Sequence, residues 1–287
     1  MITMLKTLVN ADLSLDEQII LFRKINALPL SGKVLAEAVH YFYGFLPEEN
    51  KIHVQALDIV GTGGDRQETF NISTTTALYL AKKGIPIIKN GSIAVSSASG
   101  SVDCLKALGI ACASDFKTAR QEFETRGYTF LFVRDFYPVW AKFREARLIM
   151  RKSGERTIAN LIGPLLNPFN PRYQVLGVYD EKLLQPMAEA MQALGREGFV
   201  VTSEGTDELS LSPDHHILEV RDSGISARHL DLPSLGFAYA DIRELKGGSP
   251  EENAAITRGI LEGSLTGPKR DVVLLNALLG EMAYGAR

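Results

Sequence analysis

The stretch that decides the fold reads Asp58-Ile59-Val60-Gly61-Thr62-Gly63-Gly64-Asp65, and Thr69-Phe70-Asn71-Ile72-Ser73-Thr74 follows it closely. A β-rich run ends in three glycines within four residues, and a polar segment then opens a run of helical pattern. Glycines let the backbone approach a ligand closely, and the free N–H groups at the start of a helix carry partial positive charge. A strand, a glycine-rich turn and a helix in this order indicate a phosphate-binding site.

The spacing of these glycines differs from the two common nucleotide-binding motifs. It is neither Gly-x-Gly-x-x-Gly nor the Walker A pattern with its closing Gly-Lys-Ser/Thr, and no acidic residue stands near position 85 to hold a ribose. The local pattern leaves one alternative open, which is a plain glycine-rich turn with Asn71, Ser73 or Thr74 capping a helix.

A second polar segment follows the next β-rich run. Lys89-Asn90-Gly91-Ser92 comes directly after residues 85–88, and Ser96-Ser97-Ala98-Ser99-Gly100-Ser101 stands a few residues later. In a parallel sheet, both this segment and the glycine-rich turn would lie beyond the carboxyl ends of strands, where open α/β folds bind ligands. A lysine and several hydroxyl groups there suit a polyanion, although a solvated lysine with a serine-rich loop remains the alternative.

From residue 55 onward, short β-rich runs alternate with helical pattern. We expect strands at 57–60, 85–89, 128–133, 174–179 and 199–202, and helices near 74–83, 115–126, 138–152 and 181–195. This alternation predicts an α/β fold with a mainly parallel central sheet. The last third is less regular, with a strand candidate at 216–220 and helix candidates at 251–262 and 271–282.

The first fifty residues have a helical pattern. Ser14 and Glu17 form a capping box ahead of an apolar run, and a second helix is expected from about Ser31 to Phe45, ending before Pro47.

Bulk composition favours a soluble, cytoplasmic protein. The 287 residues are 45% hydrophobic with a formal net charge of −3, so a large core is available and a global basic field for nucleic acid is absent. No apolar run of about 18 residues and no cleavable leader pattern occurs. Cys104 and Cys112 lie in apolar stretches, which indicates buried thiols rather than a disulfide.

Several motifs in a fixed order resemble the anthranilate phosphoribosyltransferases, and the resemblance covers Asp58 to about Ser210. The motifs are Gly61-Thr62-Gly63-Gly64-Asp65, Asn71-Ile72-Ser73-Thr74, Lys89-x-Gly91, Val95-Ser96-Ser97-x-Ser99-Gly100-Ser101-x-Asp103, Arg156-Thr157-Ile158-x-Asn160-Leu161-x-Gly163-Pro164-Leu165-x-Asn167-Pro168 and Asp207-Glu208. Each motif alone is weak evidence, whereas the ordered set is specific.

The resemblance implies a small N-terminal helical domain, residues 1–54 joined by a later segment, on a larger α/β domain of residues 55–287. Such enzymes are usually homodimers through the helical domain and act in tryptophan biosynthesis. The donor, 5-phosphoribosyl-1-pyrophosphate, would contact Gly61, Thr62, Gly63, Gly64, Asp65, Thr69, Asn71, Ser73, Thr74, Lys89, Gly91 and Ser101. Mg²⁺ would be held by Ser73, Asp207 and Glu208. The acceptor, anthranilate or a related small aromatic amine, would contact Asn90, Tyr137, Arg147, Arg151, Gly163 and Pro164.

No residue is expected to act as a nucleophile. Magnesium and backbone amides would stabilise charge on the departing pyrophosphate while the acceptor amine is held behind the ribose carbon. No Cys–His pair or Ser–His–Asp set stands out, and the five histidines lie outside the motifs.

The sequence departs from the family pattern on the acceptor side. Asn90 and Tyr137 stand where the family has histidines, and counting back from Arg156 puts Met150 where the family has an arginine. Because the interval from Pro138 to Thr157 is about three residues longer than in the family, Arg147 or Arg151 could take the place of that arginine. A guanidinium binds a carboxylate with two hydrogen bonds, which methionine cannot do. One helix of the usual set is also missing before Ser31, which makes dimer formation less certain.

Two other functions compete with this interpretation. A nucleoside phosphorylase on the same fold would need a Lys-His-Ser-Thr-Gly-Gly type of motif, which is absent. A degenerate relative that binds nucleic acid or a regulatory ligand is disfavoured by the intact donor motifs and the acidic balance.

Overall fold

The structure, a computed structural model, describes residues 1–48, 54–63, 67–91 and 100–285. Its N-terminal segment folds into α1 (Ile2–Asn10), α2 (Leu15–Asn26) and α3 (Gly32–Tyr43). The expected capping box is present at α2, because Glu17 N–H donates to Ser14 Oγ and Ser14 N–H donates to the Glu17 carboxylate at 2.8 Å.

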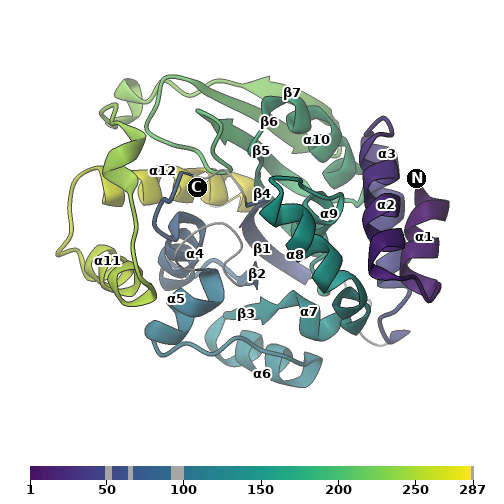
Figure 1. Cartoon of the computed structure of the whole chain (residues 1–287). Coiled ribbons are helices and arrows are strands. Elements are labelled where there is room, and N and C mark those ends of the chain that lie inside the picture. The colour runs from purple at the N-terminus through teal and green to yellow at the C-terminus, as the bar shows by residue number, and fades with distance from the viewer. Residues whose placement is uncertain (49–53, 64–66, 92–99, 286–287) are drawn as a thin grey trace.

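A seven-stranded sheet in the order β3-β2-β1-β4-β5-β6-β7 forms the centre of the molecule (Figure 1). The strands β1 to β5 run parallel, and β6 and β7 extend the sheet in antiparallel fashion. Their bounds are β1 Val54–Gly61, β2 Ile87–Gly91, β3 Tyr128–Phe132, β4 Pro171–Gly177, β5 Glu197–Ser203, β6 His215–Arg221 and β7 Gly224–Arg228. The predicted α/β class with a mainly parallel sheet is confirmed, and only β7 had no predicted counterpart.

Helices cover both faces of the sheet. One face packs against α4 (Ile72–Lys82), α5 (Ser101–Ala107), α11 (Pro250–Glu262) and α12 (Pro268–Tyr284), and the other against α6 (Phe116–Arg126), α9 (Ala159–Leu165) and α10 (Leu184–Ala193). Successive strand residues alternate between the two cores, as Ile87 and Ile88 of β2 do. The result is a three-layer α/β/α arrangement, with α1 to α3 to one side (Figure 1).

The helix expected over 138–152 is interrupted. Residues Pro138–Phe143 form a 3₁₀ helix, and α8 spans only Arg144–Lys152, after the short helix α7 (Val133–Phe136). Phe143 has non-helical backbone angles, and its ring packs edge-on against Phe22 of α2 at 5.8 Å. Burial of this aromatic side chain therefore overrides continuous helical periodicity.

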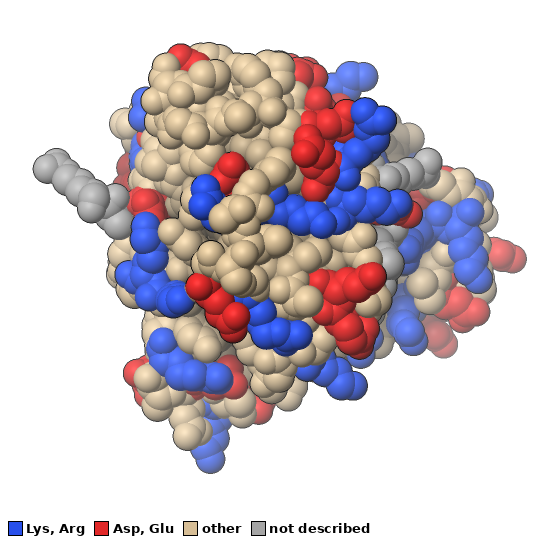
Figure 2. Space-filling model, turned by 90° about the vertical axis from the view of Figure 1, so that its left-hand side faces the viewer, with Lys and Arg blue, Asp and Glu red and all other residues tan. Residues whose placement is uncertain are grey.

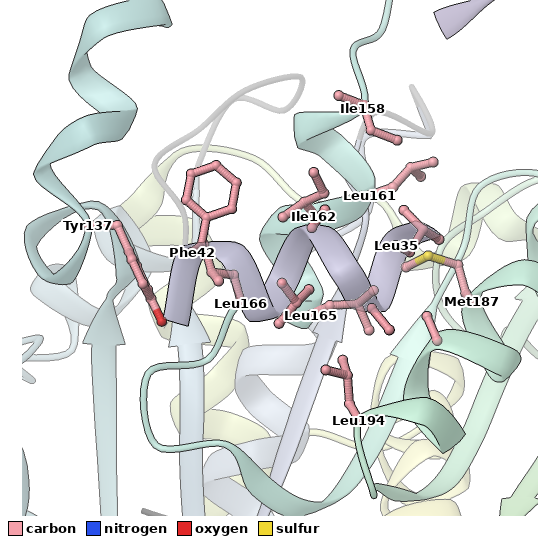
Figure 3. Packing of buried hydrophobic residues seen from close by; sticks show 14 of the residues in the cluster. Leu35, Phe42, Tyr137, Ile158, Leu161, Ile162, Leu165, Leu166, Met187 and Leu194 are labelled. Carbon is pink, nitrogen blue, oxygen red and sulfur yellow. The ribbon is translucent and has the colours of Figure 1, made fainter. Parts of the chain in front are cut away.

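Helices α1 to α3 share one apolar core with α9 and α10, which cover one face of the sheet. Figure 3 shows Leu35 and Phe42 of α3 beside Ile162 of α9 and Met187 of α10. Helices α1 and α2 also contact the 3₁₀ helix and α8, respectively, so a later segment of the chain joins the helical layer. Among the described residues, no helix combines the length and apolar character needed to cross a membrane.

A buried arginine ties α3 to the sheet. Arg196 is 1% exposed, and its guanidinium donates to Tyr43 Oη, the Leu165 carbonyl and Gln174 Oε1, each at 2.8 Å, and to Asn170 Oδ1 at 3.0 Å. These four acceptors come from four separate segments, so one side chain fixes their relative positions.

Candidate functional site

The candidate site lies where the strand order reverses. Strands β2 and β3 extend the sheet on one side of β1, whereas β4 pairs on the other side, so the topological switch point falls between β1 and β4. Open α/β sheets bind ligands outside the carboxyl ends of strands at this point. Gly61 and Gly177 end the two strands there and are paired in register.

The Asp207 loop fills the crevice between these two strand ends. A Cβ placed on Gly61 would lie 1.9 Å from Asp207 Oδ2, and one placed on Gly177 would lie 1.6 Å from the Asp207 carbonyl oxygen. Any side chain at either position would therefore displace the loop. The two glycines are required by the close approach of Asp207, rather than by their backbone angles.

The turn after β1 is held by hydrogen bonds to the end of β4 and to the Asp207 loop. Thr62 N–H donates to the Gly177 carbonyl at 3.0 Å, and Gly63 N–H donates to Asp207 Oδ2 at 2.6 Å. Gly63 has φ +68°, a conformation that L-residues adopt at a cost. The glycine-rich turn and the acidic loop thus form one unit.

A second carboxylate lies at the start of α4. Glu208 Oε1 accepts from Ser73 N–H at 3.2 Å, and Glu208 Oε2 accepts from Thr69 Oγ1 at 3.4 Å. The partial positive charge of a helix N-terminus stabilises an anion in this position. The structure therefore brings Ser73, Asp207 and Glu208 together from segments more than 130 residues apart in sequence.

Two buried threonine hydroxyls, of Thr62 in the turn and Thr74 in the first turn of α4, lack a partner among the described residues. Thr62 Oγ1 and Thr74 Oγ1 are both buried and make no hydrogen bond within the described part of the chain. Buried hydroxyls are normally hydrogen-bonded. Two such groups next to a helix N-terminus fit an oxygen-rich ligand such as a phosphate.

Lys89 and Asp58 form a buried pair of charged groups behind the turn. Lys89 is 2% exposed and its Nζ donates to the Ile59 carbonyl, while Asp58 accepts from Asn90 N–H at 3.2 Å and from Asn167 Nδ2 at 3.0 Å. Burial lowers the pKa of Lys89 and raises the pKa of Asp58, and the attraction between their charges opposes both shifts. Asp207 and Glu208 also favour the charged lysine.

The end of β2 connects the donor side of the site to α9. Asn90 Nδ2 donates to the Gly163 carbonyl at 3.1 Å, and Asn90 Oδ1 is buried without a partner within the described residues. Gly91 lies against Ser101 at the start of α5, because a Cβ there would come within 3.3 Å of Ser101 Oγ. Pro164 is buried inside α9. Asn90, Gly91, Ser101 and Gly163 are therefore near one another.

The remaining acceptor candidates separate into core and surface residues. Tyr137 is 0% exposed and packs edge-on against Phe42, as Figure 3 shows, and burial raises the pKa of its hydroxyl. Met150 is also 0% exposed and belongs to the same core, so its place in the count from Arg156 reflects packing rather than ligand contact. Arg151 is exposed at the end of α8.

Arg147 differs from its neighbours. It is half-buried, its guanidinium lies 5.2 Å from the Trp140 ring, and no hydrogen bond or ion pair to it occurs among the described residues. Burial lowers the pKa of Arg147 to about 10, which leaves the side chain charged at neutral pH. A partly desolvated cation without a protein anion is a suitable partner for a ligand carboxylate.

Magnesium fits the set of oxygen ligands that the structure brings together. Within the described residues no group of three or more His, Cys, Asp or Glu side chains could hold a metal ion. Mg²⁺ does not require such a cage, because it is commonly held by one or two carboxylates plus water and substrate phosphates. The Asp207 and Glu208 carboxylates beside a phosphate-type turn match that pattern.

Some predicted residues lie outside the described part of the chain. These are Gly64 and Asp65 of the glycine-rich turn and the stretch 92–99 with its serines. Other residues that shape the site were not predicted. Asn253 and Asn276 are lone asparagines within helical pattern, which gives no sequence signal for a role.

Comparisons with known proteins agree with this geometry. The sequence model of the family described as "Glycosyl transferase family, a/b domain" matches residues 53–286. An anthranilate phosphoribosyltransferase of Geobacter sulfurreducens is 45% identical over 231 residues, which cover 80% of this chain and 65% of the relative. The corresponding protein of Thermomicrobium roseum is 38% identical over 271 residues, covering 91% of this chain and 77% of the relative.

Solved structures give the same result. The crystal structure of anthranilate phosphoribosyltransferase from Thermus thermophilus superposes with a TM-score of 0.88 at 36% identity, covering 99% of this chain and 84% of that one. The Saccharomyces cerevisiae enzyme in complex with PRPP and Mg superposes with a TM-score of 0.78 at 26% identity, covering 99% and 82% of the two chains.

The competing interpretations can be compared with the surface and with the relatives named above. On the face drawn in Figure 2, basic and acidic side chains are interspersed, so that face offers no continuous basic surface for a nucleic acid. None of these four relatives is a nucleoside phosphorylase.

Proposed function

The chain belongs to the anthranilate phosphoribosyltransferases, and we propose that it transfers the phosphoribosyl group of 5-phosphoribosyl-1-pyrophosphate to anthranilate or a related small aromatic amine, releasing pyrophosphate. The observation that carries this proposal is the convergence of a glycine turn, a helix N-terminus and two carboxylates at the switch point of the sheet. This activity gives the chain a step in tryptophan biosynthesis.

The donor occupies the switch-point crevice. Its phosphates meet the backbone amides of the Gly61–Gly63 turn, the N-terminus of α4 and the hydroxyls of Thr62 and Thr74. Both hydroxyls are buried and have no partner within the described part of the chain, which supports this assignment. Lys89 adds a positive charge behind the turn. The proposed contacts to the donor also include Thr69, Asn71, Gly91 and Ser101. Gly64 and Asp65 belong to the same proposal and lie outside the described residues.

Magnesium would be held by Asp207, Glu208 and the Ser73 hydroxyl, with substrate phosphates and water as its remaining ligands. When bound there, it supplies positive charge that offsets the negative charge on the pyrophosphate leaving group. The backbone amides of the Gly61–Gly63 turn and the ammonium group of Lys89 stabilise the same negative charge on the pyrophosphate. These groups are already oriented before the reaction begins.

No protein nucleophile takes part in the transfer. The acceptor amine forms a bond to C1 of the ribose as the bond from C1 to the pyrophosphate oxygen breaks, and the amine loses one proton. The chain contributes by holding donor and acceptor in line. Among the described residues, both cysteines remain unpaired thiols, and burial raises the pKa of each to about 11, which makes them poor nucleophiles.

The proposed acceptor contacts are Arg147 of α8 and Asn90, which donates to the Gly163 carbonyl. Arg147 binds the acceptor carboxylate, since it is the half-buried cation of α8 that lacks a partner among the described residues. Asn90 Oδ1, which has no partner among the described residues, can accept a hydrogen bond from an aromatic amine. We keep Tyr137 in the proposed acceptor set through its hydroxyl, which is buried and makes no hydrogen bond within the described residues, while its ring packs in the core.

Steady-state kinetics with the donor, anthranilate and Mg²⁺ test the activity. Wild type should turn over only with divalent metal, and Asp207→Asn combined with Glu208→Gln should abolish turnover with the fold intact by circular dichroism. Wild-type activity in the double variant would contradict the metal assignment.

The acceptor assignment has its own pair of variants. Arg147→Ala should raise the KM for anthranilate roughly ten- to a hundredfold, because it removes a charge-assisted contact of about 1.5–3 kcal/mol. Arg151→Ala is the matched control, since Arg151 is exposed one helical turn away on α8. Equal effects of the two variants would refute a specific role for Arg147. Met150→Arg should unfold more easily and gain no activity, because it places a charge in the core.

We also propose that two copies of the chain associate through the helical layer. Exposed apolar side chains gather on α2 and α8, which pack together: Ile20 is 50% exposed, Leu148 42% and Ile149 38%. Light scattering of wild type and Ile20→Asp would test this, with a monomeric wild type contradicting it.

A further inference from the structure

Two buried asparagines on the C-terminal helices direct their side chains to the loops of the proposed site. Asn253 of α11 is 2% exposed and Asn276 of α12 is 3% exposed. A buried amide requires hydrogen-bond partners, and its choice of partners shows what it holds in place. In both cases the partners lie next to residues of the proposed donor and metal set.

Asn276 clamps the residue that follows Glu208. Its Nδ2 donates to the Leu209 carbonyl at 2.7 Å, and its Oδ1 accepts from Leu209 N–H at 3.3 Å. The same Nδ2 donates to the Val272 carbonyl of its own helix at 2.8 Å, which fixes the side-chain rotamer. The amide thus pairs with both backbone groups of Leu209, as a neighbouring strand would.

This clamp sits at the base of the acidic loop. Leu209 is fully buried, while the two residues before it turn their carboxylates toward Gly63 N–H and Ser73 N–H. A loop fixed at Leu209 has little freedom to move its carboxylates relative to α4. Metal and phosphate sites require such positioning to within about half an ångström.

Asn253 holds the other half of the site in a similar way. Its Nδ2 donates to Asn71 Oδ1 at 3.0 Å, and its Oδ1 accepts from Gly248 N–H at 2.9 Å. Asn71 stands at the N-cap of α4 but makes no side-chain capping bond there. The Asn71 side-chain amide is oriented by Asn253 of α11 instead, and this contact at Asn71 Oδ1 sets the direction of Asn71 Nδ2.

We infer that Asn253 and Asn276 are positioning residues for the donor pocket, with Asn276 fixing the Asp207–Glu208 loop and Asn253 fixing the rotamer of Asn71. The inference rests on the proposed phosphoribosyl transfer. Asn253 acts through Asn71 of the proposed donor set, and Asn276 acts through Leu209, the residue after Glu208. The C-terminal helices are thereby part of the site, although the motifs end near Ser210.

The test for Asn276 separates positioning from stability. Asn276→Leu keeps a similar volume and removes the clamp, and Leu275→Ala serves as control because Leu275 is fully buried on the same helix and is absent from the proposed site. Both variants should unfold at lower urea concentration than wild type. Only Asn276→Leu should raise the Mg²⁺ concentration for half-maximal activity, by roughly tenfold, as expected for the loss of one to two hydrogen bonds.

Asn253 is tested against Thr257, one turn further along α11. Asn253→Ala should raise the KM for the donor roughly tenfold with a smaller change in kcat. Thr257→Val removes the hydrogen bonds of Thr257 Oγ1 to Thr75 at 2.8 Å and to the Asn253 carbonyl at 2.9 Å. It leaves the hydrogen bond between the Asn253 and Asn71 side chains in place, so it should leave the donor KM unchanged.

The outcomes distinguish the inference from the function on which it rests. A wild type without metal-dependent turnover would refute the proposed function. An active wild type whose Asn276→Leu variant keeps the Mg²⁺ requirement, or whose Asn253→Ala variant shifts the donor KM no more than Thr257→Val does, would overturn the inference. If Asn276→Leu does not fold, Asn276→Ala replaces it. Failure of both to fold would assign Asn276 to stability alone and would also overturn the inference.

Discussion

Replacing Gly61 by alanine adds a single methyl group at the most crowded point of the site. The new Cβ would lie 1.9 Å from Asp207 Oδ2 and 2.9 Å from the Asp207 carbonyl oxygen. Gly61 does not have a positive φ, so alanine brings no backbone strain of its own. The substitution therefore acts almost entirely by pushing the Asp207 carboxylate away.

The displaced carboxylate loses its hydrogen bond from Gly63 N–H, which is 2.6 Å long. A hydrogen bond to a charged group is worth about 1.5–3 kcal/mol, which corresponds to roughly a ten- to 150-fold change in an equilibrium constant. Because Asp207 is also a proposed magnesium ligand, we expect the Mg²⁺ concentration for half-maximal activity to rise by that factor.

Metal-activation curves for wild type and Gly61→Ala measure this effect, and urea unfolding measures the accompanying loss of stability. Gly84→Ala is a control for a glycine substitution at the end of a helix, remote from the acidic loop. If Gly61→Ala folds and keeps the wild-type activation curve, Asp207 does not hold the metal from the position described.

Three further outcomes follow from the structure. Gly63→Ala and Gly84→Ala both place alanine at positive φ, +68° and +86°, at a cost of about 1–2 kcal/mol in stability. Calorimetry should show weaker donor binding only for Gly63→Ala. Equal donor affinities of the two variants would mean that Gly63 is needed only for its backbone conformation. Arg196→Ala removes four hydrogen bonds of a buried guanidinium, so urea unfolding should show a loss of about 3–5 kcal/mol, and a loss below about 1 kcal/mol would contradict the network. Burial raises the pKa of the Cys104 and Cys112 thiols to about 11, so alkylation at pH 7.5 should be roughly a hundredfold slower in the native protein than in urea; comparable rates would exclude native burial of these thiols.

The sheet could be predicted because its signals are local, and the glycine turn on which the donor proposal rests has a local signal too. Five strands of the α/β segment follow from short β-rich runs, and the Gly61–Gly63 turn follows from its composition. The role of Asp207 and Glu208 came from the resemblance rather than from local pattern, since an acidic pair after a strand is ordinarily a solvated turn. The structure adds the reason for their location, which is the pairing of β1 with β4.

The burial of Tyr137 and Met150 could not be predicted from counting positions, and the acceptor set stays a proposal. Tyr137 and Met150 are buried because aromatic and apolar side chains of α2, α3 and the 3₁₀ helix close over them, and such contacts have no signature in the local sequence. The interruption of the helix at Phe143 also shifts the register of α8 relative to a continuous helix. Asn253 and Asn276 acquire their roles only through contacts distant in sequence.

The asparagine contacts have a consequence for the order of folding. Asn71 and Asn253 are 182 residues apart, and Leu209 and Asn276 are 67 residues apart. Contacts of long sequence separation form slowly, because closing a large loop costs chain entropy before the contact provides any stabilisation. In refolding from urea, we therefore expect donor binding to recover with the slowest phase, after most helical signal has returned. Binding of the donor would then report on completion of the tertiary structure rather than on formation of the sheet.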